Sequence, residues 1–335
     1  MSVLVTGGCG YIGSHTVLRL LEQGEEVIVI DNLTNSSANV IEKIKQISKK
    51  KHIFFYEADI RDEQSLQKIF SDHDIQSVIH FAALKSIPDS FRDKDKYIQV
   101  NIEGTSNIIK MVKKYASKSL IFSSSASVYG VPEILPIRED EKLDPRNPYA
   151  ETKIAGERMS EQLFSDDPSK NIYVLRYFNP VGAHDSGLIG EDPKHGSTNL
   201  VPVISKVLQG ELDTLEIYGH DYETKDGTGV RDYIHITDLV DGHIAALNHA
   251  KDNEGNFGIF NLGTGTGYSV FEIISEFEKL TDMIIPYEIK ERRQGDVAEC
   301  YADPSRANKI LDWKAKHGLS KMCKDAWNWT SRGIH

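Results

Sequence analysis

The segment VLVTGGCGYIG, residues 3–13, joins a short apolar run to a glycine-rich turn. The run Val3–Val5 predicts a buried strand, and apolar residues at helical spacing follow the turn. Glycines at such a junction permit a tight turn and let the backbone approach a pyrophosphate, while the helix N-terminus offers unpaired N–H groups and a positive dipole end. The segment therefore predicts a phosphate-binding loop made of Gly7, Gly10, Tyr11, Ile12 and Gly13.

The residues that follow complete a β–α–β unit. We expect a helix over Ile12–Gln23 that stops at Gly24, and a second strand over Val27–Ile30. Asp31 comes directly after that strand, where a carboxylate can accept hydrogen bonds from both ribose hydroxyls and repels a 2′-phosphate. This arrangement favours NAD over NADP as the ligand. The alternative is a glycine-rich turn beside an unrelated aspartate.

The first half of the chain continues this alternation, which predicts an α/β fold: a Rossmann-type doubly wound parallel sheet with its ligand crevice at the carboxyl ends of the strands. The further strands are expected over Ile53–Tyr56, Ser77–Phe81, Leu120–Phe122 and Ile172–Tyr177. After the Gly/Asp/Pro-rich residues 182–197 the rhythm becomes irregular and indicates a smaller C-terminal α+β lobe. Its helices are expected over Val201–Leu208, Asp238–Ala250 and Val270–Leu280. We expect an NAD-binding domain over residues 1–180 and a substrate-binding domain over residues 181–335, with the site in the cleft between them.

Composition excludes several classes of function. The 335 residues include 39 basic and 50 acidic side chains, a net charge of −11, which argues against a nucleic-acid-binding protein. No apolar stretch approaches the roughly 18 residues of a membrane helix. The three cysteines have neither metal-ligand nor disulfide-framework spacing, which fits a reducing compartment. We therefore expect a cytoplasmic protein with no membrane partner and no metal.

Tyr149 and Lys153 are spaced to share one face of a helix, for which Asn147 could be the N-cap and Pro148 the first residue. A tyrosine has an ordinary pKa near 10, so acting as a base near pH 7 requires about 4 kcal/mol of differential stabilisation. A lysine ammonium about 4 Å away could supply about that much at an effective dielectric near 20. The pair is thus a candidate acid–base centre, although the same spacing is common in surface helices.

Ser125 ends the serine run that follows Leu120–Phe122, so a hydroxyl is expected at the carboxyl edge of the same sheet. Together with the glycine loop, Tyr149 and Lys153, it resembles the TGxxGxxG, strand-end Ser/Thr and YxxxK motifs of the extended short-chain dehydrogenase/reductase superfamily. The resemblance narrows to the UDP-glucose 4-epimerase family over nearly the whole chain. The segments that carry it are FAALK (81–85), SSSASVYG (123–130), RYFNPVGA (176–183) and GVRDYIH (229–235).

This resemblance implies NAD-dependent 4-epimerisation of UDP-hexoses. The sugar 4-hydroxyl loses its proton while hydride passes to NAD, and the transient 4-keto sugar turns over and takes the hydride back on its other face. Tyr149 is implied as general base and acid, Lys153 as the residue that tunes its pKa and binds the nicotinamide ribose, and Ser125 as a bridge to the substrate 4-oxygen. Ser124 is the fallback for that bridge.

The resemblance also implies ligand-binding residues and a homodimer. NAD, tightly bound, is expected at Gly7, Gly10, Tyr11, Ile12, Gly13, Asp31, Asn32, Asp59, Ile60, Phe81, Ala82, Lys85, Asn101, Ser123, Tyr149, Lys153 and Tyr177. The UDP-sugar is expected at Lys85, Ser125, Tyr149, Asn179, Asn199, Leu200, Tyr218, Arg231, Arg293, Asp296 and Cys300. Arg231 and Arg293 would hold the pyrophosphate, because a guanidinium fork suits that geometry. His235 is expected to be structural.

Cys300 lies where family members restricted to glucose and galactose commonly carry tyrosine. A thiol leaves room for a 2-N-acetyl group, so we expect activity on UDP-GlcNAc and UDP-GalNAc as well as on UDP-glucose and UDP-galactose. The alternative is that Cys300 is a small apolar filler and another side chain closes the pocket.

Two other functions compete with this interpretation. A nucleotide-sugar 4,6-dehydratase shares the glycine loop and the YxxxK helix, but it carries carboxylates after the strand-end hydroxyl, where this chain has Ala126 and Ser127. A non-catalytic NAD-sensing regulator could share the fold, because a fold does not fix a function. Such a regulator has little need for Ser125, Tyr149 and Lys153, so their presence favours an enzyme.

Overall fold

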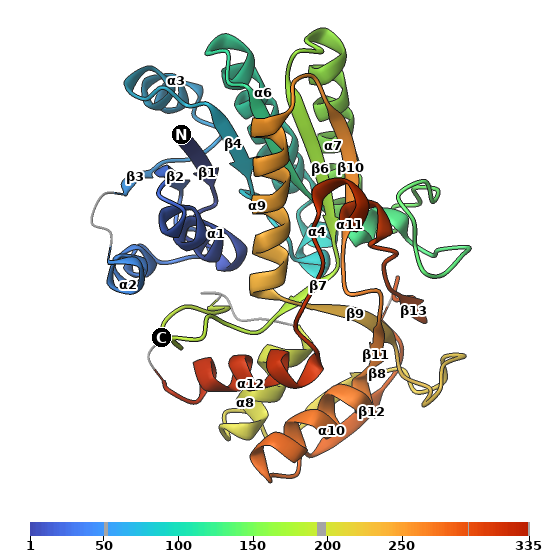
Figure 1. Cartoon of the computed structure of the whole chain (residues 1–335). Coiled ribbons are helices and arrows are strands. Elements are labelled where there is room, and N and C mark those ends of the chain that lie inside the picture. Colours follow the sequence, from blue (N-terminus) through green and yellow to red (C-terminus); the bar gives the residue numbers. More distant parts are fainter. Residues whose placement is uncertain (50–52, 193–198, 294, 334–335) are drawn as a thin grey trace.

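The computed structural model describes residues 1–49, 53–192, 199–293 and 295–333. Its centre is a seven-stranded parallel sheet in the order β10-β6-β5-β4-β1-β2-β3 (Figure 1). The strands are β1 (Ser2–Thr6), β2 (Glu26–Asp31), β3 (Phe54–Glu57), β4 (Ser77–His80), β5 (Ser119–Ser125), β6 (Asn171–Tyr177) and β10 (Phe257–Leu262). The expected fold class and the six expected strands are confirmed. β5 is longer than expected and includes the serine run itself.

Helices cover both faces of this sheet because its strands are apolar on both sides. One face packs against α1 (Tyr11–Glu22), α2 (Asn39–Ser48), α9 (Ile236–Asp252) and α11 (Ser305–Leu311). The other face packs against α3 (Glu63–Asp72), α6 (Gly104–Lys114) and α7 (Pro148–Asp166). Three short segments, α4 (Ile87–Arg92), α5 (Lys94–Tyr97) and the π-helix η1 (Ile98–Glu103), lead into α6. They were not expected from the sequence.

A smaller lobe lies beyond the carboxyl ends of the strands (Figure 1). Its own core joins α8 (Leu200–Leu208), α10 (Val270–Thr281) and α12 (Leu319–Thr330) to short strands. Those strands are β7 (Asn179–Val181), β8 (Leu215–Tyr218), β9 (Val230–His235), β11 (Gly267–Ser269), β12 (Tyr287–Lys290) and β13 (Glu299–Cys300). The expected helices of the second half are present.

The chain returns to the large sheet after entering the lobe. α9 packs against α1, β5 and β6, and β10 pairs in parallel with β6 at the sheet edge. The division at residue 180 stays a prediction, but these two elements lie on the sheet side although they follow it in sequence. No helix among the described residues has the length and apolar character needed to cross a membrane.

Candidate active site

A cleft of about 2000 Å³ runs along the carboxyl edge of the sheet and is closed on its other side by the lobe. Single small-molecule pockets hold about 300–1,000 Å³, so this cleft has room for two ligands. Its walls include most of the residues expected to bind NAD or a UDP-sugar. From the sheet side these are Gly7, Gly10, Tyr11, Ile12, Gly13, Asp31, Asn32, Ile60, Phe81, Ala82, Lys85, Ser125, Tyr149, Lys153 and Tyr177. From the lobe side they are Asn179, Asn199, Leu200, Tyr218, Arg231, Arg293, Asp296 and Cys300.

The glycine loop has the shape that a pyrophosphate needs. Gly7 has φ of +68°, and a Cβ on Gly13 would lie 2.1 Å from the carbonyl oxygen of Gly7. The turn is therefore closed to any larger side chain at position 13, and helix α1 starts directly behind it at Tyr11. The first residues of α1 line the cleft, so the positive end of the helix lies there, which fits a dinucleotide at this position.

Asp31 lies at the end of β2, nearly buried, and is held by three donors. Its Oδ2 accepts from the Cys9 amide at 2.9 Å, and its Oδ1 accepts from the Leu33 amide at 2.9 Å and the Ser36 hydroxyl at 2.7 Å. A carboxylate offers about four acceptor positions, so one remains for a ligand hydroxyl. The loop and Asp31 together suit the diphosphate and ribose of NAD.

Asp59 does not line the cleft. Its carboxylate is bound by the Arg61 guanidinium at 2.9 and 2.8 Å and by the Asn32 amide at 2.9 Å. The Arg61 hydrogen bonds hold the pKa of Asp59 well below its usual range. Asp59 thus fixes Asn32 and Arg61, which do line the cleft, beside the end of β3.

Tyr149 stands at the start of α7, where Asn147 caps the helix by accepting from the Ala150 amide at 2.8 Å and Pro148 takes the first turn. This local arrangement was predicted and is confirmed. Burial raises the pKa of Tyr149 to about 12, while a side-chain hydrogen bond with Ser125 works in the opposite direction. The cost of burying a phenolate thus exceeds what the neighbouring side chains return, so the expected lowering of the Tyr149 pKa depends on the positive nicotinamide ring as well and stays a prediction.

Lys153 lies one turn further along α7 and is also buried. Its ammonium donates to the carbonyl oxygen of Ser123 at 2.8 Å and lies 5.8 Å from the centre of the Tyr149 ring. Burial lowers the pKa of Lys153 to about 8, and the carboxylate of Glu157 opposes that shift. The lysine is therefore a poorly solvated cation beside the tyrosine. Its position lets it act on Tyr149 through its positive charge rather than through a hydrogen bond.

Three residues of the predicted set lie behind the cleft wall. Ser123 is fully buried, and its hydroxyl pairs with Nε2 of His243 at 3.1 Å. The amide of Asn101 bonds both backbone groups of Leu84 and the hydroxyl of Thr152. The fallback Ser124 donates to Glu157 on α7 at 2.5 Å and does not line the cleft. Ser125 is thus the hydroxyl of this run that meets Tyr149.

The lobe supplies two guanidinium groups to the cleft. Arg231, on β9, lies 3.8 Å from the carboxylate of Asp296 and donates to its neighbour's carbonyl oxygen at 2.9 Å. The guanidinium of Arg293 stacks on the ring of Tyr218, 3.7 Å from its centre. Cys300 pairs with Arg231 in the β13–β9 ladder, and burial raises the pKa of its thiol to about 11. Cys300 is therefore a small neutral side chain in the wall.

Glu191 is a cleft residue that the sequence analysis missed. Its carboxylate accepts from Lys85 at 3.0 Å and from Asn199 at 3.1 Å, so it joins two residues expected to touch the ligands. Nothing in its glycine-rich surroundings distinguishes it from a solvated surface acid. Tyr11 was predicted, but its hydroxyl also links the two sides of the cleft by donating to the Gly182 carbonyl oxygen at 2.6 Å.

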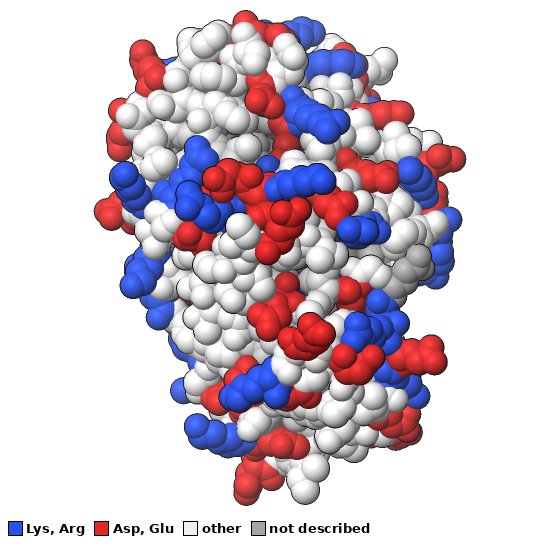
Figure 2. Space-filling model, turned by 90° about the vertical axis from the view of Figure 1, so that its right-hand side faces the viewer, with Lys and Arg blue, Asp and Glu red and all other residues white. Residues whose placement is uncertain are grey.

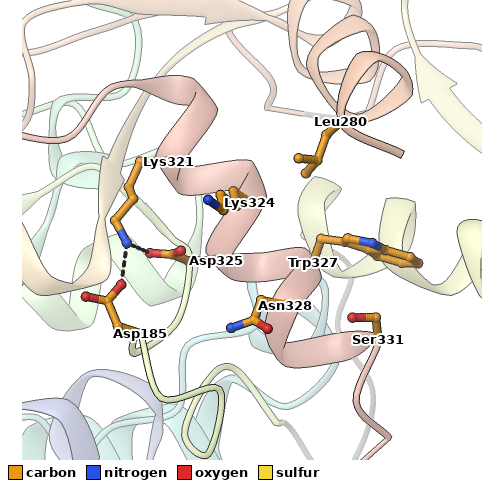
Figure 3. A pocket seen from close by; sticks show the side chains of 8 residues that line it. All are labelled: Asp185, Leu280, Lys321, Lys324, Asp325, Trp327, Asn328 and Ser331. Atoms are coloured by element: carbon orange, nitrogen blue, oxygen red, sulfur yellow. Dashed lines mark hydrogen bonds and ion pairs between the residues drawn. The ribbon is translucent and has the colours of Figure 1, made fainter. Parts of the chain in front are cut away.

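A second pocket, of about 480 Å³, lies along α12 (Figure 3). Its Lys321 is held between Asp185 and Asp325, the latter at 2.6 Å. Asp325 in turn bonds Nε2 of the buried His235 at 3.0 Å, and His235 caps α9. These groups join α12 to α9, so His235 has the structural surroundings expected of it. On the face drawn in Figure 2, acidic and basic side chains are intermixed.

Comparison with known proteins agrees with this geometry. The family model described as GDP-mannose 4,6 dehydratase matches residues 4–326. The UDP-glucose 4-epimerase of Haemophilus influenzae is 51% identical over 330 residues, 98% of this chain and 97% of that protein. That of Bacillus subtilis is 48% identical over 335 residues, 100% of this chain and 98% of that protein. The crystal structure of UDP-glucose 4-epimerase from Bifidobacterium longum in complex with NAD+ and UDP has a TM-score of 0.95 and 46% identity, and the match covers 99% of this chain and 98% of that chain. The chain belongs to the UDP-glucose 4-epimerase family of extended short-chain dehydrogenase/reductases.

Proposed function

We propose that this protein is an NAD-dependent UDP-hexose 4-epimerase that interconverts UDP-glucose and UDP-galactose. The observation that carries the proposal is one buried arrangement: Tyr149 hydrogen-bonded to Ser125, with Lys153 on the same helix face, beside a glycine loop shaped for a dinucleotide. NAD, when bound, supplies the ring that takes a hydride from C4 of the sugar and returns it. The relatives that match over nearly the full chain are epimerases of this kind.

The residues of this chain provide the proton chemistry. Tyr149 takes the proton from the sugar 4-hydroxyl and gives it back after the keto sugar has turned, and the Ser125 hydroxyl stabilises its deprotonated form by donating to it. The cation of Lys153 favours that form as well. Burial works in the opposite direction, so full activation of Tyr149 needs the positive ring in addition.

The lobe provides side chains that bind the nucleotide. Arg231 and Arg293 bring two guanidinium groups into the cleft, which suits the two charges of a UDP pyrophosphate. A nucleotide held at its pyrophosphate leaves the sugar free to rotate between its two faces. This is the motion that a 4-epimerase requires.

We further propose that UDP-GlcNAc and UDP-GalNAc are substrates. The support is the small neutral side chain of Cys300, which lies in the cleft wall beside Arg231. A 2-N-acetyl group needs more space than a hydroxyl, and a thiol occupies less of that space than a phenol ring.

A cytoplasmic homodimer is a further proposal. The three cysteines carry free thiols, which fits a reducing compartment. The dimer is supported by the family resemblance of the sequence. Light scattering of the purified chain measures its mass directly, and a monomer of 37.6 kDa would contradict the dimer.

The function is tested by incubating the purified protein with UDP-galactose, without added NAD, and resolving the products by chromatography. We expect UDP-glucose to appear, and we expect Tyr149→Phe to lower turnover by roughly 10²–10⁴-fold while NAD remains bound. Wild-type protein that binds NAD but converts no UDP-hexose would favour the regulator. A 4-keto-6-deoxy product would favour the dehydratase, which the absence of an acid at Ala126 and Ser127 argues against.

A further inference from the structure

Glu191 presents a largely buried carboxylate, 11% exposed, in the wall of the cleft. Its main chain is held from behind by helix α12. The Glu191 carbonyl oxygen accepts from Nε1 of Trp329 at 3.4 Å, and a Cβ on Gly190 would lie 2.5 Å from the Trp329 ring. The place of residue 191 therefore does not depend on its own side chain.

The carboxylate of Glu191 joins the two walls of the cleft at one atom. Its Oε1 accepts from the ammonium of Lys85 at 3.0 Å and from the amide nitrogen of Asn199 at 3.1 Å. Lys85 follows strand β4 on the sheet side of the cleft, and Asn199 precedes helix α8 on the lobe side. Two donors from opposite walls thus converge on one oxygen.

This contact also decides which way the Asn199 amide points. A carboxylate accepts hydrogen bonds and donates none, so the amide must turn its nitrogen, not its oxygen, toward Glu191. Asparagine is a preferred helix N-cap, in which role its side-chain oxygen accepts from a first-turn N–H. Asn199 is the N-cap residue of α8, yet within residues 199–208 its side chain makes no capping hydrogen bond. The bond to Glu191 therefore replaces a local contact that would hold the amide in another orientation.

We propose that Glu191 is a positioning residue for the UDP-sugar: it holds the Lys85 ammonium and the Asn199 amide nitrogen as converging donors for phosphate oxygens of the nucleotide. Lys85 uses one of its three protons on Glu191, so two remain for the ligands. The negative charge of Glu191 disfavours an anionic ligand, so its benefit must come from the hydrogen bonds that it accepts. The inference rests on the proposed function, which makes the ligand a nucleoside diphosphate sugar.

Glu191→Ala and Glu191→Gln separate the hydrogen bonds from the charge. Both variants remove the charge, but glutamine keeps a carbonyl oxygen that can accept from Lys85 and Asn199. Isothermal titration calorimetry of the NAD-loaded protein with UDP gives the Kd. We expect Glu191→Ala to raise the Kd about three- to tenfold, because the Asn199 amide can then turn to cap α8. Glu191→Gln should leave the Kd no higher than that of the wild type.

The sign of the effect distinguishes this role from simple electrostatics. If only the charge of Glu191 mattered, both variants would bind UDP more tightly than the wild type does. Glu191→Ala that binds UDP as tightly as the wild type, or an equal loss of affinity in Glu191→Gln, would overturn the proposal.

A double-mutant cycle shows whether Glu191 acts through its partners. In the Asn199→Ala background, Glu191→Ala should raise the Kd by a smaller factor than it does in the wild type, because one of the two positioned donors is already gone. An equal factor in both backgrounds would overturn the proposal.

Steady-state kinetics gives a readout that a purely structural role would not show. The two donors hold the nucleotide in the ground state and the transition state alike, so KM for UDP-galactose should rise with the Kd while kcat stays within about twofold. The NAD content of each variant is measured on the same samples, so that only loaded protein is compared. A fall of kcat with an unchanged KM would contradict the assignment. Wild-type protein that binds UDP but converts no UDP-hexose would instead refute the proposed function, and the calorimetry would still decide the role of Glu191.

Discussion

The ammonium group of Lys153 donates a 2.8 Å hydrogen bond to the carbonyl oxygen of Ser123. This hydrogen bond connects helix α7 to strand β5. It holds the helix face that carries Tyr149 against the end of that strand. The same nitrogen lies 5.8 Å from the centre of the Tyr149 ring. Lys153 is thus a structural cross-link and a source of charge at once.

Replacing Lys153 by methionine removes the charge and keeps much of the side-chain volume. We expect kcat to fall roughly 10²-fold and the acid limb of the pH profile to move to higher pH, because the cation no longer favours the deprotonated tyrosine. Lys170→Met is the matched control, since Lys170 is also buried and donates to a carbonyl oxygen, that of Ser117, at 2.9 Å. Similar losses of kcat in both variants would contradict a specific effect of the Lys153 charge, because losing either buried lysine contact would then lower kcat alike.

A methyl group added to the glycine loop should prevent the dinucleotide from binding. In Gly13→Ala the new Cβ would lie 2.1 Å from the Gly7 carbonyl oxygen, so the turn must open. We expect the purified variant to carry less than a tenth of the NAD that the wild type retains, measured on the supernatant after acid denaturation. Gly318→Ala meets nothing within 4 Å and should retain NAD in full. Normal NAD content in Gly13→Ala would refute the loop as the pyrophosphate site.

Cys300→Tyr tests the width of the sugar pocket. If the small side chain admits the acetyl group, the variant should lose at least tenfold in kcat/KM for UDP-GalNAc and less than threefold for UDP-galactose, since pocket sterics discriminate by about 10–200-fold. Cys300→Ser keeps the size and should keep both activities. Equal effects of Cys300→Tyr on the two substrates, or wild-type protein inactive on UDP-GalNAc, would contradict the pocket argument.

Buried histidines should make the fold acid-sensitive. Burial lowers the pKa values of His15 and His80 to about 3 and that of His243 to about 4, from an ordinary value of 6.5. The folded chain therefore binds fewer protons than the unfolded chain below pH 6.5, so the stability is fully present above 6.5 and is lost as pH falls toward 3. Each histidine contributes up to about 1.4 kcal/mol per pH unit in that window.

Urea unfolding at pH 7 and pH 5 measures this effect. The variant His80→Gln keeps an amide between Thr6 and Thr105, the hydroxyl partners of His80, but removes its titration. It should lose less free energy of unfolding between the two pH values than the wild type does. The same change at the exposed His220 is the matched control substitution. An unaltered slope in His80→Gln would refute a neutral buried histidine at position 80.

Local sequence signals predicted the sheet well because they depend on neighbours along the chain. The apolar run Val27–Ile30, the cap at Asn147 and the stop at Gly24 all form as expected. The helix α4 was missed although Ser86 caps it and Pro88 lies in its first turn, because six residues are too few to show helical periodicity. The place of β10 beside β6 could not be predicted, since a strand pattern does not say which sheet the strand joins.

The sequence predicted which residues form the candidate site better than it predicted the contacts between them. Spacing placed Tyr149 and Lys153 on one helix face, but it could not show that the lysine reaches the Ser123 carbonyl oxygen. The burial that raises the Tyr149 pKa likewise comes from tertiary packing. The hydrogen bonds from Ser127 to Ser125 depend on the turn into the 3-10 helix η2 (Ala126–Tyr129), which the sequence analysis considered only as the position where a dehydratase carries an acid.

In the proposed reaction the hydrogen on C4 of the sugar leaves and returns within one turnover, while Tyr149 carries only the hydroxyl proton. The most direct test uses UDP-galactose labelled with deuterium at C4, incubated with the purified protein in ordinary water and followed by NMR and mass spectrometry. We predict UDP-glucose that retains the deuterium at C4, with inverted configuration. Loss of the label to solvent would contradict the account, because it would mean that C4 is deprotonated and not oxidised.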